Sequence, residues 1–239
     1  MTTSALRALP SWMRTVGVFD LETTGVQPST DRIVTAYVGV LDHEGRRVSA
    51  RHWLLDPGIE IPDAAAAVHG ITTDHARSHG AAAAESVAEI VAALAELFAA
   101  GTPVVAYNAP FDFTLLHHEA LRHGHTPLDS PGPIIDPLVV DKACDQYRRG
   151  KRTLALVAEH YGIELTNSHE ASADAEAAGR VALALARAFP EQHDGDAHAF
   201  HRAQMEWART QSASLTDYLI RVGRMAPGES VNGAWPAHV

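Results

Sequence analysis

Three stretches near the start of the chain have patterns of hydrophobic and polar residues that are typical of β-strands. In residues 15–22, Asp20 and Glu22 share one face with the valines that precede them, while the residues between them lie on the other face. Residues 33–41 and 47–55 are also strand-like, and the DHEGR segment that separates them is typical of a hairpin turn. We therefore expect the chain to open with three strands.

Farther along, the apolar residues recur at the spacing of a helix. Across residues 84–100 they fall at i, i+3, i+4 and i+7, and Gly101 ends the predicted helix. The further elements predicted are strands at 103–107 and 134–135 and helices at 110–123, between 135 and 147, at 153–161 and at 174–189. Residues 57–79 show little periodicity, so we expect a loop with one short helical turn. This order indicates an α/β domain with a mixed five-stranded sheet flanked by helices.

The composition changes after Pro190, where the segment EQHDGDAHAF suggests a break. We expect a tail at residues 1–13, a main domain at 14–190, a helical C-terminal extension at 191–225 and a coil tail at 226–239. The extension is predicted to hold two helices. Their inward-facing residues would be Phe200, Ala203 and Trp207 in the first, and Leu215, Tyr218, Leu219 and Val222 in the second.

Charge and composition limit the function of these 239 residues. With 19 basic and 29 acidic side chains the net charge is −10, so bulk attraction to a duplex or to a membrane surface is excluded. Any nucleic-acid role needs a local positive patch, a divalent metal or a partner. No apolar run approaches the ~18 residues of a membrane span, and the first residues lack the apolar core of a signal peptide. With a single cysteine, Cys144, these features lead us to expect a cytoplasmic protein with no membrane partner.

The segment FDLETTG places two carboxylates, those of Asp20 and Glu22, on one face at the end of a predicted strand. Two neighbouring carboxylates repel each other, and a divalent cation would neutralise them. The alternative is an acidic strand end that simply enters a turn.

Two further acidic motifs follow. In YNAPFDF, Asp112 falls in the first turn of a predicted helix, where its charge favours the helix dipole even without any other role, and Asn108 would cap that helix. In HEASADAEAAG, His169 would lie in the loop that approaches a helix and Asp174 in its first turns, so that both side chains face one cleft. A purely structural His–Asp pair is the alternative.

Together and in this order, the three motifs resemble the DEDD superfamily of 3′→5′ exonucleases, in the subgroup whose third motif is H-x4-D. The chain looks most similar to the proofreading exonucleases of the DNA polymerase III epsilon type. The segments AAVHGIT at 66–72 and KRTLALVAEHYGI at 151–163 add to the likeness, which covers about residues 14–188. The resemblance implies a ribonuclease-H-like fold with the active site across one end of the sheet.

The resemblance also implies the chemistry of the site. Two divalent cations, Mg²⁺ or Mn²⁺, would be held by the four acidic residues, and His169 would take the proton from the attacking water. The metal ligands would be Asp20, Glu22, Asp112 and Asp174. The substrate contacts would be Thr23, Thr24, Gly25, His69, Asn108 and Phe111. For His69, Asn108 and Phe111 the alternatives are a loop histidine, a helix cap and a core residue.

The substrate implied is the 3′ end of a nucleic acid, DNA rather than RNA, with nucleoside 5′-monophosphates as products. The basic run at 148–152 would contact the phosphates of the strand or form a solvated surface. The C-terminal extension matches none of these motifs, and it would cover the flank of the domain, dimerise it, or bind a polymerase or another protein. The alternatives are an exoribonuclease that degrades short RNA and, in a different class, a scaffold subunit without catalysis.

Overall fold

The computed structural model describes residues 9–165 and 169–239, so the first eight residues of the expected tail lie outside the described residues. A mixed sheet lies at the centre, in the order β4-β3-β2-β1-β5-β6. Its strands are β1 (Thr15–Thr23), β2 (Ile33–Asp42), β3 (Arg47–Asp56), β4 (Ala81–Ala82), β5 (Val104–Val105) and β6 (Ile134–Ile135). β1, β2 and β3 are antiparallel, β5 and β6 run parallel to β1, and β4 runs parallel to β3.

The mixed sheet is therefore confirmed, although it has six strands where we expected five. The additional strand, β4, consists of two alanines that pair with Leu55 and Asp56 at the edge of the sheet. An alanine run carries no alternation of polar and apolar residues, so only the tertiary pairing defines this strand.

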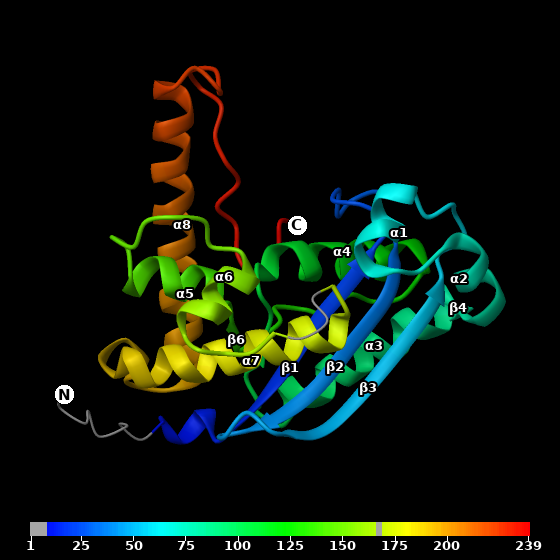
Figure 1. The fold of residues 1–239 in the computed structure, drawn as a ribbon, viewed down its shortest axis with the longest axis horizontal. Helices are drawn as coiled ribbons and strands as arrows, with labels where there is room; N and C mark the ends of the chain where they lie inside the picture. Colours follow the sequence, from blue (N-terminus) through cyan, green and yellow to red (C-terminus); the bar gives the residue numbers. More distant parts are fainter. Residues whose placement is uncertain (1–8, 166–168) are drawn as a thin grey trace.

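Helices cover both faces of the sheet (Figure 1). On one face lie α3 (Ala83–Ala99) and α4 (Ala109–Arg122), and on the other lie α5 (Pro137–Cys144), α6 (Leu154–His160) and α7 (Ala171–Ala188). Two short 3₁₀ helices, Ser11–Met13 and Pro190–His193, flank this layered body. Within residues 9–165 and 169–239, we find no helix with the length and apolar character needed to cross a membrane.

Strand β1 carries the alternation that the sequence predicts. Val16 and Val18 pack in the cluster under α7, whereas Phe19 and Leu21 pack in the cluster under α3 and α4. The close approach of α7 depends on Gly179, where a Cβ atom would come within 2.5 Å of Val18. The acidic end of β1 and the start of α7 are thereby brought together.

The segment 57–79 holds more helix than the single short turn we expected. It forms α1 (Asp63–His69) and α2 (Thr73–His79). Gly70 ends α1 in the left-handed conformation, with φ of 78°, and the Thr72 side chain accepts the N–H of His75 to cap α2. Both helices are too short to be stable alone, so the small cluster beneath them, which includes Ile61 and Ala76, stabilises them through packing.

The C-terminal extension is one continuous helix, α8 (Ala197–Arg221), where we expected two. The residues between the two predicted apolar faces are mostly polar, but the hydroxyls of Thr210 and Thr216 donate to the carbonyls of Glu206 and Ser212 one turn earlier, both at 2.9 Å. Their hydrogen bonds are thus made within the helix and do not end it. The far end of α8 projects from the body as an arm (Figure 1).

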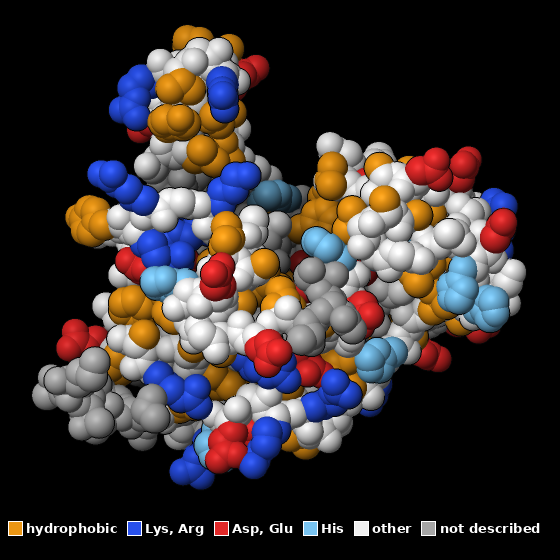
Figure 2. Space-filling model, in the orientation of Figure 1, with side chains coloured by type: hydrophobic (Ala, Val, Ile, Leu, Met, Phe, Trp, Pro, Cys, Tyr) orange, Lys and Arg blue, Asp and Glu red, His pale blue; other side chains and the backbone are white. Residues whose placement is uncertain are grey.

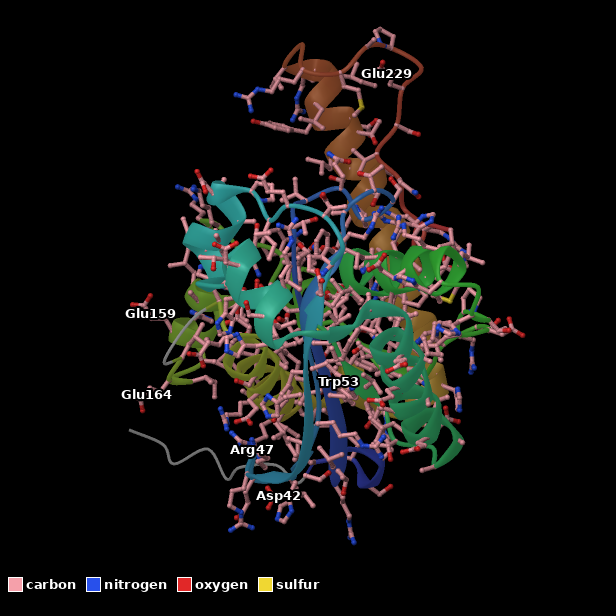
Figure 3. The ribbon with its side chains drawn as sticks, turned by 90° about the vertical axis from the view of Figure 1, so that its right-hand side faces the viewer. Asp42, Arg47, Trp53, Glu159, Glu164 and Glu229 are labelled. Carbon is pink, nitrogen blue, oxygen red and sulfur yellow. The ribbon has the colours of Figure 1, made fainter. Side chains whose placement is uncertain are left out.

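Residues 226–239 form no helix or strand, as expected, but they are not detached from the body. They run back beside α8 (Figure 1), and Glu229 lies near the outer end of the arm (Figure 3). Trp235 is buried among residues of the main core and of α8. The tail is therefore coil that packs against the folded body.

Candidate active site

Three carboxylates from distant parts of the chain meet at one end of the sheet. Asp20 and Glu22 come from β1 and Asp174 comes from α7, and one oxygen of each lies within 4.8 Å of the others. The pairing of β1 with β2 shifts register between Glu22 and Thr23, so the strand is irregular beside the site. A group of this composition and size is suited to a divalent cation.

Asp112 lies directly behind this group. It is fully buried in the first turn of α4, and its Oδ1 accepts the backbone N–H of Leu21 at 3.1 Å. Leu21 stands between the two acidic residues of β1, and the charge of Asp112 raises the pKa of Asp20. The structure thus brings together all four acidic residues expected from the sequence.

The carboxylates perturb one another strongly. Burial, and after it the charges of its three acidic neighbours, raise the pKa of Asp20 well above its usual value. Burial and the charge of Asp174 raise the pKa of Glu22 to about 8, and burial also raises the pKa of Asp112 and of Asp174. Among the described residues, no lysine or arginine forms an ion pair with any of these four side chains.

The donor set fits Mg²⁺ or Mn²⁺. Both are hard cations that prefer carboxylate oxygens, and a bound cation would relieve the mutual repulsion. In addition, the Oδ1 atom of Asp174 is buried and has no hydrogen-bond partner among the residues described. A buried, unpartnered carboxylate oxygen on a residue of this acidic group is a good candidate for a metal ligand.

His169 lies in the turn that precedes α7, in the place expected from the sequence. Its φ is 73°, a left-handed conformation that is uncommon outside glycine, and its backbone N–H donates to Oδ2 of Asp174 at 3.2 Å. The residue is exposed, and it lines a cavity of about 400 Å³ together with Glu22 and His69. The imidazole is therefore on the solvent side of the carboxylates.

His69 ends α1 on the wall of the same cavity. Its Nδ1 accepts the N–H of Ile71 at 3.2 Å, and burial lowers its pKa although the nearby backbone of Thr23 opposes that shift. A lowered pKa keeps the imidazole neutral at physiological pH. His69 is thus not a loop residue, because it ends α1, and it lies in the cavity wall beside Glu22.

Thr23, Thr24 and Gly25 follow the acidic end of β1. The Thr23 hydroxyl donates to the Gly25 carbonyl at 2.6 Å, and the Thr24 hydroxyl donates to Asp31 at 3.2 Å and accepts the N–H of Arg32. Gly25 leaves room for Asp31, whose Oδ2 would lie 2.6 Å from a Cβ atom there. Because the two hydroxyls are occupied, a ligand at this turn would meet mainly backbone groups.

Asn108 precedes α4 but its side chain does not cap that helix. Its φ of 63° is left-handed, and it is exposed at the start of the helix that carries Asp112. The cap interpretation is therefore wrong, and the amide stays available for a ligand. Phe111, one turn later, is half-buried and packs against the core cluster of α3 and α4, which favours the core interpretation that we left open.

The basic run at 148–152 is largely occupied by internal ion pairs. Arg148 and Arg152 both bind the buried carboxylate of Asp141, so they tie the α5–α6 loop to α5. Arg149 and Lys151 remain exposed. Half of the expected phosphate-binding patch is thus structural.

Sequence reasoning missed Asp136. This carboxylate is fully buried at the start of α5 and accepts the N–H groups of Asn108 and Ala109, each at 3.0 Å, and the indole N–H of Trp235 at 3.3 Å. It therefore fixes the turn that leads to Asp112. An aspartate directly before Pro137 is a typical helix start, and this was the available signal.

A family model described as "Exonuclease" matches residues 18–182, and the chain belongs to this exonuclease family. The resemblance expected from the three acidic motifs is thereby confirmed. Among curated relatives, a "DNA polymerase III subunit epsilon-like protein" from Rhodobacter capsulatus is 32% identical over 186 residues, which cover 76% of this chain and 25% of that protein. A "DNA polymerase III PolC-type" from Lacticaseibacillus paracasei is 29% identical over 168 residues, covering 70% of this chain and 11% of the relative.

Solved structures show the same fold. Exonuclease I of E. coli in complex with a dA16 oligonucleotide superposes with a TM-score of 0.65 at 24% identity, covering 75% of this chain and 42% of that one. Its complex with a dT13 oligonucleotide gives a TM-score of 0.64 at 25% identity, with the same coverage. The chain thus spans a quarter or less of these curated relatives and about two fifths of exonuclease I.

Proposed function

We propose that this protein is a metal-dependent 3′→5′ exonuclease that releases nucleoside 5′-monophosphates from single-stranded or frayed ends, DNA in preference to RNA. The observation that carries the proposal is the convergence of Asp20, Glu22 and Asp174 within 4.8 Å in a chain of the exonuclease family. The preference for DNA is supported by relatives named for DNA polymerase III and by neighbours solved with deoxyoligonucleotides. The matched span supports a catalytic domain at residues 14–190, with 191–225 as its extension.

The four carboxylates would hold two divalent cations. When bound, such ions activate a water molecule and neutralise the charge that develops on the leaving oxygen. One oxygen from each of Asp20, Glu22 and Asp174 lies within 4.8 Å of the others. Asp112 instead accepts the backbone N–H of Leu21, between the two acidic residues of β1. His169 would accept the proton of the attacking water, because its imidazole is exposed beside the carboxylates and its backbone is anchored to Asp174.

The cavity lined by Glu22, His69 and His169 would hold the terminal nucleotide. Its volume of about 400 Å³ lies in the usual range of small-ligand sites. The neutral His69 would bind by hydrogen bonding and not by charge. Backbone groups at Thr23–Gly25 would meet the terminal 3′-hydroxyl, since the two threonine hydroxyls are already bonded internally.

The proposal is tested by digestion of 5′-labelled DNA and RNA oligonucleotides, single- and double-stranded, with Mg²⁺, Mn²⁺ or EDTA. We expect a ladder that shortens from the 3′ end, requires the metal and is absent in Asp20→Ala. Faster digestion of RNA would favour the short-RNA exoribonuclease. Failure to cleave any strand with either metal would refute the enzyme and favour the scaffold. A polymerase or other protein partner and a cytoplasmic location remain predictions.

A further inference from the structure

The nucleic-acid strand upstream of the cut bond needs a binding surface of its own. The cavity at His69 and His169, of about 400 Å³, has room for about one nucleotide. The remainder of the strand must leave on another side. Asn108, at the start of the helix that carries Asp112, lines a second cavity, of about 220 Å³, that is bounded by α5, α8 and the C-terminal tail.

This second cavity continues into a third. Lys142, Gln211 and Leu215 line both, and the third, of about 760 Å³, extends between α5 and α8 to Tyr218 and Arg221. We name the two together the α5–α8 groove. It runs from the first turn of α4 toward the projecting end of α8, where hydrophobic and basic side chains gather on the surface (Figure 2).

The groove offers the groups that bind a single strand. Lys142 lies where the two cavities meet, and within the described part of the chain it forms no ion pair. Leu215 and Tyr218 are exposed by 45% and 47%, and the guanidinium of Arg221 lies 5.7 Å from the centre of the Tyr218 ring. Cations bind phosphates, and an exposed aromatic ring such as that of Tyr218 stacks on a base, while Leu215 adds apolar contact.

Two acidic side chains, Asp136 and Asp217, also line the groove. Neither strongly repels a phosphate, for different reasons. Asp136 is fully buried, and its carboxylate accepts several N–H groups, so little of its charge reaches a ligand. Asp217 is exposed, but it stands on the helical turn between Leu215 and Arg221, so a cation on the same helix offsets it. In a chain of net charge −10, a groove that carries Lys142 and Arg221 is a favourable route for a polyanion, since neither side chain forms an ion pair within the residues that the structure describes.

We propose that the α5–α8 groove binds the single strand upstream of the cut bond, with Lys142 on its phosphates and Tyr218 under a base. This inference rests on the proposed exonuclease function. From Ala208 to Arg221 the helix is about 20 Å long, at 1.5 Å per residue. A stacked strand advances about 3.4 Å per nucleotide, so the groove holds about six nucleotides, or fewer when the strand is extended.

The test compares kcat/KM for single strands of two to twelve nucleotides. In the wild type we expect the rate constant to rise with length up to about seven nucleotides and then to level off. In Tyr218→Ala and in Lys142→Gln, the ratio between a ten-nucleotide strand and a dinucleotide should fall about tenfold, in line with the loss of a stacked base or a phosphate contact. Tyr147→Ala is the matched control, because Tyr147 is 88% exposed and lines neither cavity.

A second measurement separates this inference from the catalytic proposal. Fluorescence anisotropy of a labelled ten-nucleotide strand with Asp20→Ala reports binding without turnover, and Tyr218→Ala in that background should weaken it about tenfold. Digestion without length dependence, or equal losses in Tyr147→Ala and Tyr218→Ala, would overturn the groove and leave the exonuclease standing. Weakened binding in a protein that cleaves nothing would support the groove and refute the exonuclease.

Discussion

We expect replacement of Glu22 by glutamine to stabilise the protein when no divalent metal is bound. In the folded protein, burial and the charge of Asp174 raise the pKa of Glu22 from 4.5 to about 8. The raised pKa means that the folded state binds this proton more tightly than the unfolded state does. The stability that results is complete below pH 4.5 and is lost as the pH rises from 4.5 to 8. Glutamine occupies nearly the same volume without the charge.

The magnitude follows from the size of this interval. Each pH unit between 4.5 and 7 costs about 1.4 kcal/mol, which gives about 3 kcal/mol at pH 7. The side chain is partly exposed, and solvent screening reduces the figure to about 2 kcal/mol. For a chain of this length that corresponds to a rise in Tm of about 4–8 °C.

The assay is thermal unfolding at pH 7 in EDTA and in Mg²⁺ or Mn²⁺. Glu22→Gln should unfold at a higher temperature than the wild type in EDTA, and the metals should raise the Tm of the wild type by more than that of the variant. Glu159→Gln is the control, because Glu159 points away from the body at its edge (Figure 3). A Glu22→Gln protein that is no more stable than wild type in EDTA would refute the argument that the carboxylates repel one another.

Three further outcomes are expected. His169→Ala should lower kcat far more than it raises KM in steady-state digestion of a labelled strand, and equal losses in the two would argue against a general base. Burial lowers the pKa of His201, whose Nδ1 accepts the N–H of Ile134, to about 4, so stability should be lost as the pH falls from 6.5 toward 4. In urea titrations between pH 7 and pH 5, the wild type should lose about 1 kcal/mol more than His201→Gln, and parallel curves would contradict this. Trp235→Phe removes the indole N–H that Asp136 accepts and should lower the free energy of unfolding by about 1 kcal/mol, measured by urea titration at pH 7. An unchanged midpoint would show that this hydrogen bond adds nothing to stability.

Most of the sheet could be predicted because β1 places its acidic and apolar residues at period two, while β2, β5 and β6 are apolar runs bounded by turns. The misses have local causes. Strand β4 is a pair of alanines defined by a neighbour, and α1 and α2 depend on a small cluster around Ile61. Helix α8 passes through a polar middle because threonine hydroxyls bond within the helix, which propensity alone does not reveal.

The acidic residues of the site were predictable for a different reason. A pair of carboxylates on one strand face, as at Asp20 and Glu22, is visible in the sequence, and so is an acidic residue at a helix start, as at Asp112. The sequence could not show that the Asn108 side chain leaves the helix uncapped, because an asparagine before a helix reads the same whether or not it caps. Nor was the role of the arginines at 148 and 152, since their partner, Asp141, is buried by the packing of α5.

The sequence by itself determined the three long strands, the main helices of the layered body, the acidic residues and the family to which the chain belongs. Those features depend on the spacing of residues within short segments, which can be read directly from the sequence. The tertiary structure alone decided that Asp174 meets β1 across some 150 residues, that Asp136 fixes the turn before Asp112, and that α5 and α8 enclose a groove. These contacts arise where the burial of apolar faces brings remote segments together, and no local pattern encodes the distance between two such segments.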